Sequence, residues 1–181
     1  KYDLVILGIN TSNAYERLDT YNDFMDDYYS LYRWTAKLSV DYPEYNIVLI
    51  HHASAGEDII EDKILSGSNI KVLNKTINSY ETAFASKCTL TYGSTMGYEL
   101  NGHNQPSYFI DPGFRCSFLP EKGCDYIDDK KVSSYDDLVT LMSDIVDRGN
   151  LPKITQEISD SFCLSSSDAS DRIYNFFINR R

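Results

Sequence analysis

Apolar residues in this chain occur as short continuous runs that alternate with longer segments of helical periodicity. The first run, residues 2–9, is nearly continuous, which is typical of a strand that is covered on both faces. In residues 22–40, apolar side chains recur at spacings of three and four, which predicts a helix with one buried side. That side consists of Phe24, Tyr28, Leu31, Trp34 and Leu38. We interpret this aromatic stripe as part of the core and not as a surface on which a ligand stacks.

The alternation of strands and helices continues to about residue 147. Further strands are predicted over residues 46–50, 69–73, 88–92 and 107–110. Further helices are predicted over residues 57–65, 78–86, 94–102 and 134–147. Residues 111–129 are rich in turn formers and contain one short run, 126–127, that we interpret as an edge strand. A last helix is expected from about residue 168.

Strands that alternate with helices imply an α/β fold, here a Rossmann-like parallel sheet with helices on both faces. Because the first strand needs cover on both faces, we expect it at the centre of the sheet. With 181 residues, the chain is long enough for one sizeable domain and too short for two ordinary ones. We expect this domain to span residues 1–150 and to be followed, over 151–181, by a linker and a closing C-terminal helix.

The composition narrows the classes of function. Hydrophobic residues make up 42% of the chain, enough for a core, but no apolar run is long enough to cross a bilayer. The formal net charge of -10 argues against a nucleic acid as partner. None of the cysteines forms a C-x-x-C pair, which predicts reduced thiols, no zinc site and a cytoplasmic protein. The basic end, Arg180-Arg181, is compatible with a peripheral contact to the acidic inner face of the membrane.

The strongest candidate chemistry lies where the strand at 88–92 meets the next helix. Gly93 permits a tight turn there, and the helix opens on two hydroxyls, Ser94 and Thr95. A helix start carries unpaired backbone N–H groups and about half a positive charge, so this turn can cradle a phosphate. Glu99 lies one helical turn after Thr95 and could accept hydrogen bonds from hydroxyls of the group that carries the phosphate. The alternative is that Ser94 only caps the helix.

Two histidines, His51 and His52, follow the strand at 46–50. In a parallel sheet, ligands bind beyond the carboxyl ends of the strands, so these histidines are expected on the same edge as Ser94 and Thr95. A histidine there can donate a hydrogen bond to phosphate, although either one could equally be structural. The chain has no G-x-G-x-x-G turn after its first strand, no P-loop and no G-x-S-x-G elbow, which argues against the enzyme classes that need them.

Together, His52, the strand near Asn69, residues 79–85, and the stretches "YGSTMGYEL" and "QPSYFIDPG" resemble the C-terminal half of GT-B glycosyltransferases. The group most similar to this chain is the bacterial surface- and capsule-polysaccharide transferases, some of which use CMP-activated sugars. In that group a His-Pro pair and a Ser/Thr pair hold the nucleotide phosphates, and a glutamate on the following helix meets the ribose. The resemblance assigns these roles to His52, with His51 as the alternative because Ala53 replaces the proline, and to Ser94, Thr95 and Glu99.

The resemblance implies a domain that binds the nucleotide-sugar donor (CMP-, UDP- or CDP-linked) of an enzyme that extends a cell-surface glycan, with no further cofactor. It places the catalytic residues in an N-terminal half, so we expect this chain to be part of a longer enzyme and to be inactive alone. Two alternatives stay open. One is half of an enzyme that transfers a polyol phosphate from a CDP-linked donor. The other is a non-enzymatic Rossmann-like module that binds a nucleotide or a partner protein.

Overall fold

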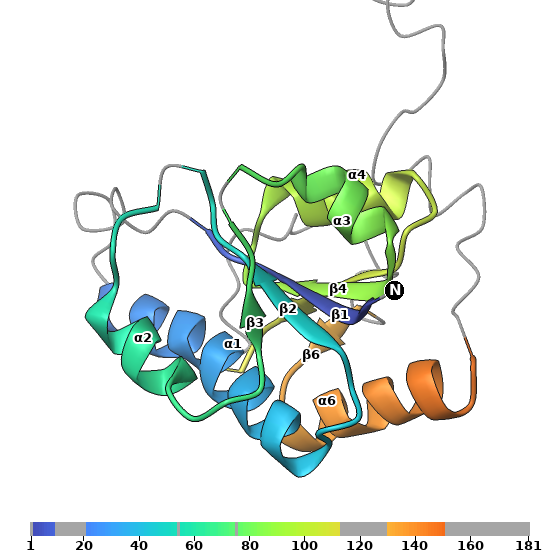
Figure 1. Ribbon diagram of the computed structural model, residues 1–181, viewed down its shortest axis with the longest axis horizontal. Coiled ribbons are helices and arrows are strands. Elements are labelled where there is room, and N and C mark those ends of the chain that lie inside the picture. Colours follow the sequence, from blue (N-terminus) through green and yellow to red (C-terminus); the bar gives the residue numbers. More distant parts are fainter. Residues whose placement is uncertain (1, 10–20, 54, 75, 113–129, 151–181) are drawn as a thin grey trace, which may run out of the picture.

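The computed structural model describes residues 2–9, 21–53, 55–74, 76–112 and 130–150. These residues form one parallel sheet with helices packed on both of its faces, which is a Rossmann-like α/β fold (Figure 1). The predicted fold class is therefore confirmed. The expected helix near residue 168 and the unit at 151–181 lie outside the described residues, as does the expected edge strand at 126–127.

The sheet has six strands in the order β3-β2-β1-β4-β5-β6, and every neighbouring pair is parallel. The strands are β1 (Tyr2–Leu7), β2 (Ile47–Ile50), β3 (Lys71–Val72), β4 (Ser86–Thr91), β5 (Ser107–Ile110) and β6 (Lys131–Val132). Leu4 of β1 pairs with Ile47 on one side and with Cys88 on the other, so the first strand is internal, as its apolar run predicts.

The helices divide between the two faces of this sheet (Figure 1). One face is covered by α1 (Tyr21–Asp41), α2 (Ile59–Leu65) and α6 (Tyr135–Met142), which continues into the π-helical turn η2 (Ser143–Asp147). The other face is covered by α3 (Ser79–Phe84) and α4 (Thr95–Gly102). Alternate residues of β1 serve the two sides: Leu4 and Ile6 belong to the larger core cluster, and Val5 and Leu7 to the smaller one.

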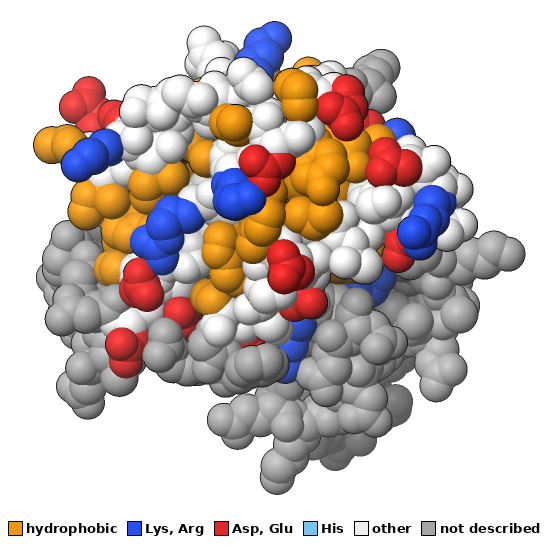
Figure 2. Space-filling view, turned by 90° about the horizontal axis from the view of Figure 1, so that it is seen from below, with side chains coloured by type: hydrophobic (Ala, Val, Ile, Leu, Met, Phe, Trp, Pro, Cys, Tyr) orange, Lys and Arg blue, Asp and Glu red, His pale blue; other side chains and the backbone are white. Residues whose placement is uncertain are grey.

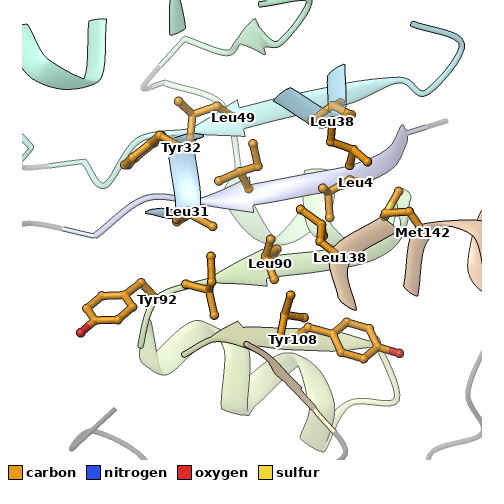
Figure 3. Packing of buried hydrophobic residues seen from close by; sticks show 14 of the residues in the cluster. Leu4, Leu31, Tyr32, Leu38, Leu49, Leu90, Tyr92, Tyr108, Leu138 and Met142 are labelled. Carbon is orange, nitrogen blue, oxygen red and sulfur yellow. The ribbon is translucent and has the colours of Figure 1, made fainter. Parts of the chain in front are cut away.

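The larger cluster joins α1 and α6 to the sheet. Leu31, Tyr32 and Leu38 of α1 pack with strand residues such as Leu4, and Leu138 of α6 closes the cluster from the side (Figure 3). The aromatic stripe predicted from the sequence is core: Phe24, Tyr28, Leu31 and Leu38 are buried, and the half-buried Trp34 packs against them. Each such side chain contributes about 1.5–3 kcal/mol by leaving water.

The outer surface of the helices α1, α2 and α6 carries mixed charges. Figure 2 shows acidic and basic side chains interspersed among hydrophobic ones, with no field of a single sign. Some of these charges pair along α1 and η2, as in the ion pairs Arg33–Asp26 and Arg148–Asp144. Exposed pairs of this kind contribute little to stability, at most about 1 kcal/mol each. Within the described ranges, no helix has the length and apolar character needed to cross a membrane.

Two local differences from the sequence prediction have simple causes. β4 begins at Ser86, where a helix end is predicted, because α3 ends at Phe84 and the Ser86 hydroxyl bonds back to the Ala83 carbonyl. β6 is not predicted at all. It has only two residues, one of them a lysine, and so leaves no apolar run in the sequence.

Candidate functional site

The carboxyl ends of all the strands meet at one edge of the sheet, because the strands are parallel. From β1 the chain moves outward to β2 and β3, then crosses back to place β4 on the other side of β1. The strand order therefore reverses between β1 and β4. In open α/β sheets, ligands bind in the crevice outside the carboxyl ends at such a switch point. The residues that follow β1 and β4 therefore lie where sheets of this kind bind their ligands.

Thr91, the last residue of β4, fixes the turn at this point. Its hydroxyl donates a hydrogen bond to the Leu7 carbonyl at the end of β1, at 3.0 Å. The same oxygen accepts a bond from the Ser94 backbone N–H at 3.3 Å. Thr91 is fully buried, so one side chain ties together the ends of both strands and the turn that begins α4.

The turn has the geometry that the sequence predicts. Gly93 has φ of +112°, in the region that side chains disfavour, so glycine is needed there. Ser94 is the N-cap of α4, and its Oγ accepts a bond from Met96 N at 3.3 Å. The capping interpretation of Ser94 is therefore correct. It does not exclude a phosphate contact, because the hydroxyl keeps its own hydrogen to donate. Ser94 is partly exposed and Thr95 is exposed.

Close packing sets the position of α4. A Cβ added at Gly97 would lie 2.9 Å from Cε1 of Phe109 on β5, so no larger residue fits without movement. Asn101 then bonds to β5 in both directions: its Nδ2 donates to the Ser107 carbonyl, and its Oδ1 accepts from Ser107 N. These contacts, near the beginning and near the end of α4, hold the helix against β5. The pair of glycine and buried asparagine was not singled out from the sequence.

Glu99 already has a partner within the protein. The Tyr80 hydroxyl of α3 donates a hydrogen bond to Glu99 Oε2 and so links α3 to α4. A carboxylate has about four acceptor positions, which leaves capacity for ligand hydroxyls beside Tyr80. Glu99 is partly exposed, and Tyr80 is 43% exposed. Ser94, Thr95 and Glu99 therefore do not lie in a closed core.

The two histidines have different surroundings. His52 is exposed, and its carbonyl accepts a bond from Ala55 N. The side chain of His51 is only 21% exposed, and its Nδ1 lies 3.2 Å from Glu61 Oε1 of α2. Both follow β2, with β1 between them and β4. Neighbouring strands are about 4.8 Å apart, so the ends of β2 and β4 are separated by roughly 10 Å.

Glu61 is a candidate residue that the sequence analysis missed. It is 3% exposed, whereas Ile59 and Ile60 beside it point to solvent. The cause is the register of α2. Ile64 and Leu65 pack on the core, and Glu61 lies three and four residues before them, on the same side. That spacing is the signal that could have found it.

Burial raises the pKa of Glu61 to about 7, and the nearby Asp58 and Asp62 add to the increase, while hydroxyls of Tyr32 and Tyr28 oppose it. The carboxyl therefore titrates near neutral pH, unlike an exposed glutamate. Gly8, just after β1, lets the strand end approach the Tyr32 hydroxyl beside this carboxyl: a Cβ there would lie 3.2 Å from Tyr32 Oη. A buried carboxyl with a shifted pKa at a ligand-binding edge is a candidate for function.

Asp111 was also not singled out from the sequence. It follows β5 at the same edge and is 2% exposed. In the part of the chain that the structure describes, no three or more His, Cys, Asp or Glu residues group together as a metal site. Comparison of this chain with models of known protein families, with curated proteins and with solved structures gives no match.

Proposed function

We propose that this domain binds the nucleotide-sugar donor of a GT-B glycosyltransferase that builds a bacterial surface polysaccharide. One observation carries the proposal. α4 begins on Ser94 directly after β4, beside the end of β1, at the point where the strand order reverses. A helix start at a switch point is the usual place for a phosphate in sheets of this kind.

The surroundings of this helix start support a phosphate contact. Gly93 brings the backbone close without a side chain, and Thr95 exposes a second hydroxyl next to Ser94. Hydroxyl and backbone N–H donors, together with the helix dipole, stabilise negative charge there. We place the nucleotide phosphates at this turn and the ribose hydroxyls at Glu99, one turn further along α4.

From the spacing of neighbouring strands, the histidines lie roughly 10 Å away, on the other side of β1. A nucleoside diphosphate with its sugar can bridge this distance. In this arrangement His52, which is exposed, contacts phosphate, and His51 is the alternative. The reaction would transfer the sugar from the donor to a growing glycan. We assign no catalytic residue in this chain, because the resemblance places the general base in an N-terminal domain facing the same edge.

Calorimetry with CMP, CDP, UDP and GDP on the full chain tests the proposal. We expect binding of at least one of the four, with loss of affinity in Ser94→Ala/Thr95→Val. A matched control is Ser134→Ala/Thr140→Val, because Ser134 caps α6 as Ser94 caps α4. Preference for CDP would favour a polyol-phosphate donor. Absence of binding to all four nucleotides would contradict a nucleotide site and leave a protein-binding module as the better hypothesis.

A further inference from the structure

A buried polar cluster lies under the carboxyl ends of β1 and β2, between α1 and α2. At its centre is Glu61, whose Oε2 accepts a long hydrogen bond from the Tyr28 hydroxyl at 3.4 Å. The hydroxyls of Tyr28 and Tyr32 are 2.5 Å apart. Burial raises the pKa of both tyrosines, so at neutral pH they stay protonated and act as donors. One of the two carboxyl oxygens, Oε2, thus accepts a hydrogen bond from α1.

The other carboxyl oxygen, Oε1, accepts no such hydrogen bond. Oε1 is fully buried and has no hydrogen-bond partner among the described residues, although His51 Nδ1 lies 3.2 Å away. An unpaired buried carboxyl oxygen destabilises the folded state, because it has lost its hydrogen bonds to water. At this distance a single proton between nitrogen and oxygen would satisfy both atoms. The proton can reside on nitrogen or on oxygen.

We propose that Glu61 is a positioning residue for His51: the two side chains share one proton between Oε1 and Nδ1, and this fixes the ring at the ligand-binding edge. We call them the Glu61–His51 pair. That the edge binds a nucleotide rests on the function proposed above, whereas the pair itself does not.

The groups around the pair favour sharing near neutral pH. From α1, Tyr28 and Tyr32 hydrogen-bond to the carboxyl and favour its ionised form. From α2, Asp58 and Asp62 oppose a further negative charge. Asp58 itself accepts a bond from the Tyr29 hydroxyl at 2.8 Å. Burial is the largest effect, and it brings the pKa of the carboxyl close to the ordinary pKa of an imidazole, about 6.5. The two groups then titrate as one unit.

Sharing has a consequence for ligands. Above neutral pH, an ionised Glu61 accepts from Nδ1–H and holds the ring in one tautomer. As pH falls, the pair takes up a proton and changes from negative to neutral, and a further proton gives it a net positive charge. Affinity for a phosphate at this edge should therefore rise as pH falls, with Glu61 controlling the range over which it does so.

NMR of the imidazole nitrogens in the full chain without ligand tests the pair directly. The sequence contains three histidines, so His52 and His103 serve as internal references. In the wild type we expect His51 to keep its proton on Nδ1 at high pH. In Glu61→Gln we expect that preference to be lost and the ring to titrate about one pH unit lower, because the neighbouring negative charge is gone. His52 and His103 should not change.

The matched control is Glu57→Gln, which changes an exposed glutamate just before α2 and should leave His51 unaltered. If Glu61→Gln does not fold, carboxyl NMR of His51→Gln gives the reciprocal measurement. There Glu61 should titrate at higher pH than in the wild type. A His51 curve that is identical in folded wild type and Glu61→Gln, or a Glu61 curve unchanged by His51→Gln, overturns the proposal. A coupled pair in a chain that binds none of the four nucleotides supports the pair and contradicts the proposed function.

Discussion

Thr91 and Leu7 are joined by a hydrogen bond that crosses the switch point of the sheet, from the Thr91 hydroxyl to the Leu7 carbonyl at 3.0 Å. Because the Thr91 oxygen also accepts from Ser94 N, the bond couples the central strand to the turn that begins α4. The candidate phosphate cradle is thus built on the two central strands of the sheet and not on a free loop.

Thr91→Val keeps the shape of this side chain and removes both bonds. We expect the free energy of unfolding to fall by about 1–2 kcal/mol, since a buried hydrogen bond contributes about 1 kcal/mol and the Ser94 N–H loses an acceptor. Urea denaturation measures the change. Thr95→Val, at an exposed position, should stay within about 0.5 kcal/mol of the wild type. Equal effects of the two substitutions would show that the hydrogen bonds of Thr91 do not stabilise the fold.

Gly97→Ala should destabilise the domain. A methyl group there would meet the Phe109 ring at 2.9 Å and push α4 away from β5. We expect a loss of about 1–3 kcal/mol from overpacking, which exceeds the gain of up to about 1 kcal/mol in helix propensity. Gly56→Ala is the control, because nothing lies within 4 Å of a Cβ at that position. A stabilised Gly97→Ala would mean that α4 can shift without cost.

Ser94→Ala/Thr95→Val should weaken binding of the preferred nucleotide by about 2–4 kcal/mol, since bonds to charged groups contribute about 1.5–3 kcal/mol each and do not add fully. The fold should survive, because a lost cap costs about 1 kcal/mol. Calorimetry at fixed pH, with circular dichroism as the check on folding, gives the answer. If affinity is unchanged in the folded double variant, the phosphate site is elsewhere.

Glu99→Gln separates two roles of that side chain. If Glu99 contacts ribose, the variant should lose about 1 kcal/mol or more of binding to a ribonucleotide, and most of the preference over its 2′,3′-dideoxy analogue. Tyr80→Phe removes only the link between α3 and α4. It should lower stability slightly and leave the preference for ribose intact. A wild type that does not discriminate against the dideoxy analogue argues against the ribose contact.

Glu61 makes stability depend on pH in an unusual direction. Its pKa is about 7 in the folded protein, against 4.5 for a glutamate carboxyl in water, so between these values the folded state holds more protons than the unfolded state. The free energy of unfolding should therefore fall as pH rises from about 4.5 to 7, by up to about 3 kcal/mol. Attraction between the ionised carboxyl and His51 makes this decrease smaller. Glu61→Gln should flatten that part of the profile in urea denaturation. An unchanged profile would place the Glu61 carboxyl in an ordinary, ionised state.

The sequence alone determines the architecture because the signals are local. Burial on both faces requires the apolar run of β1, and a helix against the sheet requires the three- and four-residue spacing of α1. Parallel strands then bring the residues after β2 and β4 to one edge, so His51, His52, Ser94 and Thr95 can be placed there from chain order. The Gly93 turn and the Ser94 cap also depend only on their neighbours in sequence.

Only the tertiary structure decides which of those side chains are held, and by what. Glu61 meets Tyr28 across 33 positions of chain, and Glu99 meets Tyr80 on a different helix. Thr91 reaches Leu7 across 84 positions. Such contacts depend on how α2 turns against α1 and how closely α4 approaches β5. Hydrophobic periodicity fixes which side of a helix is buried, but the polar partners on that side follow from the packing of separate elements.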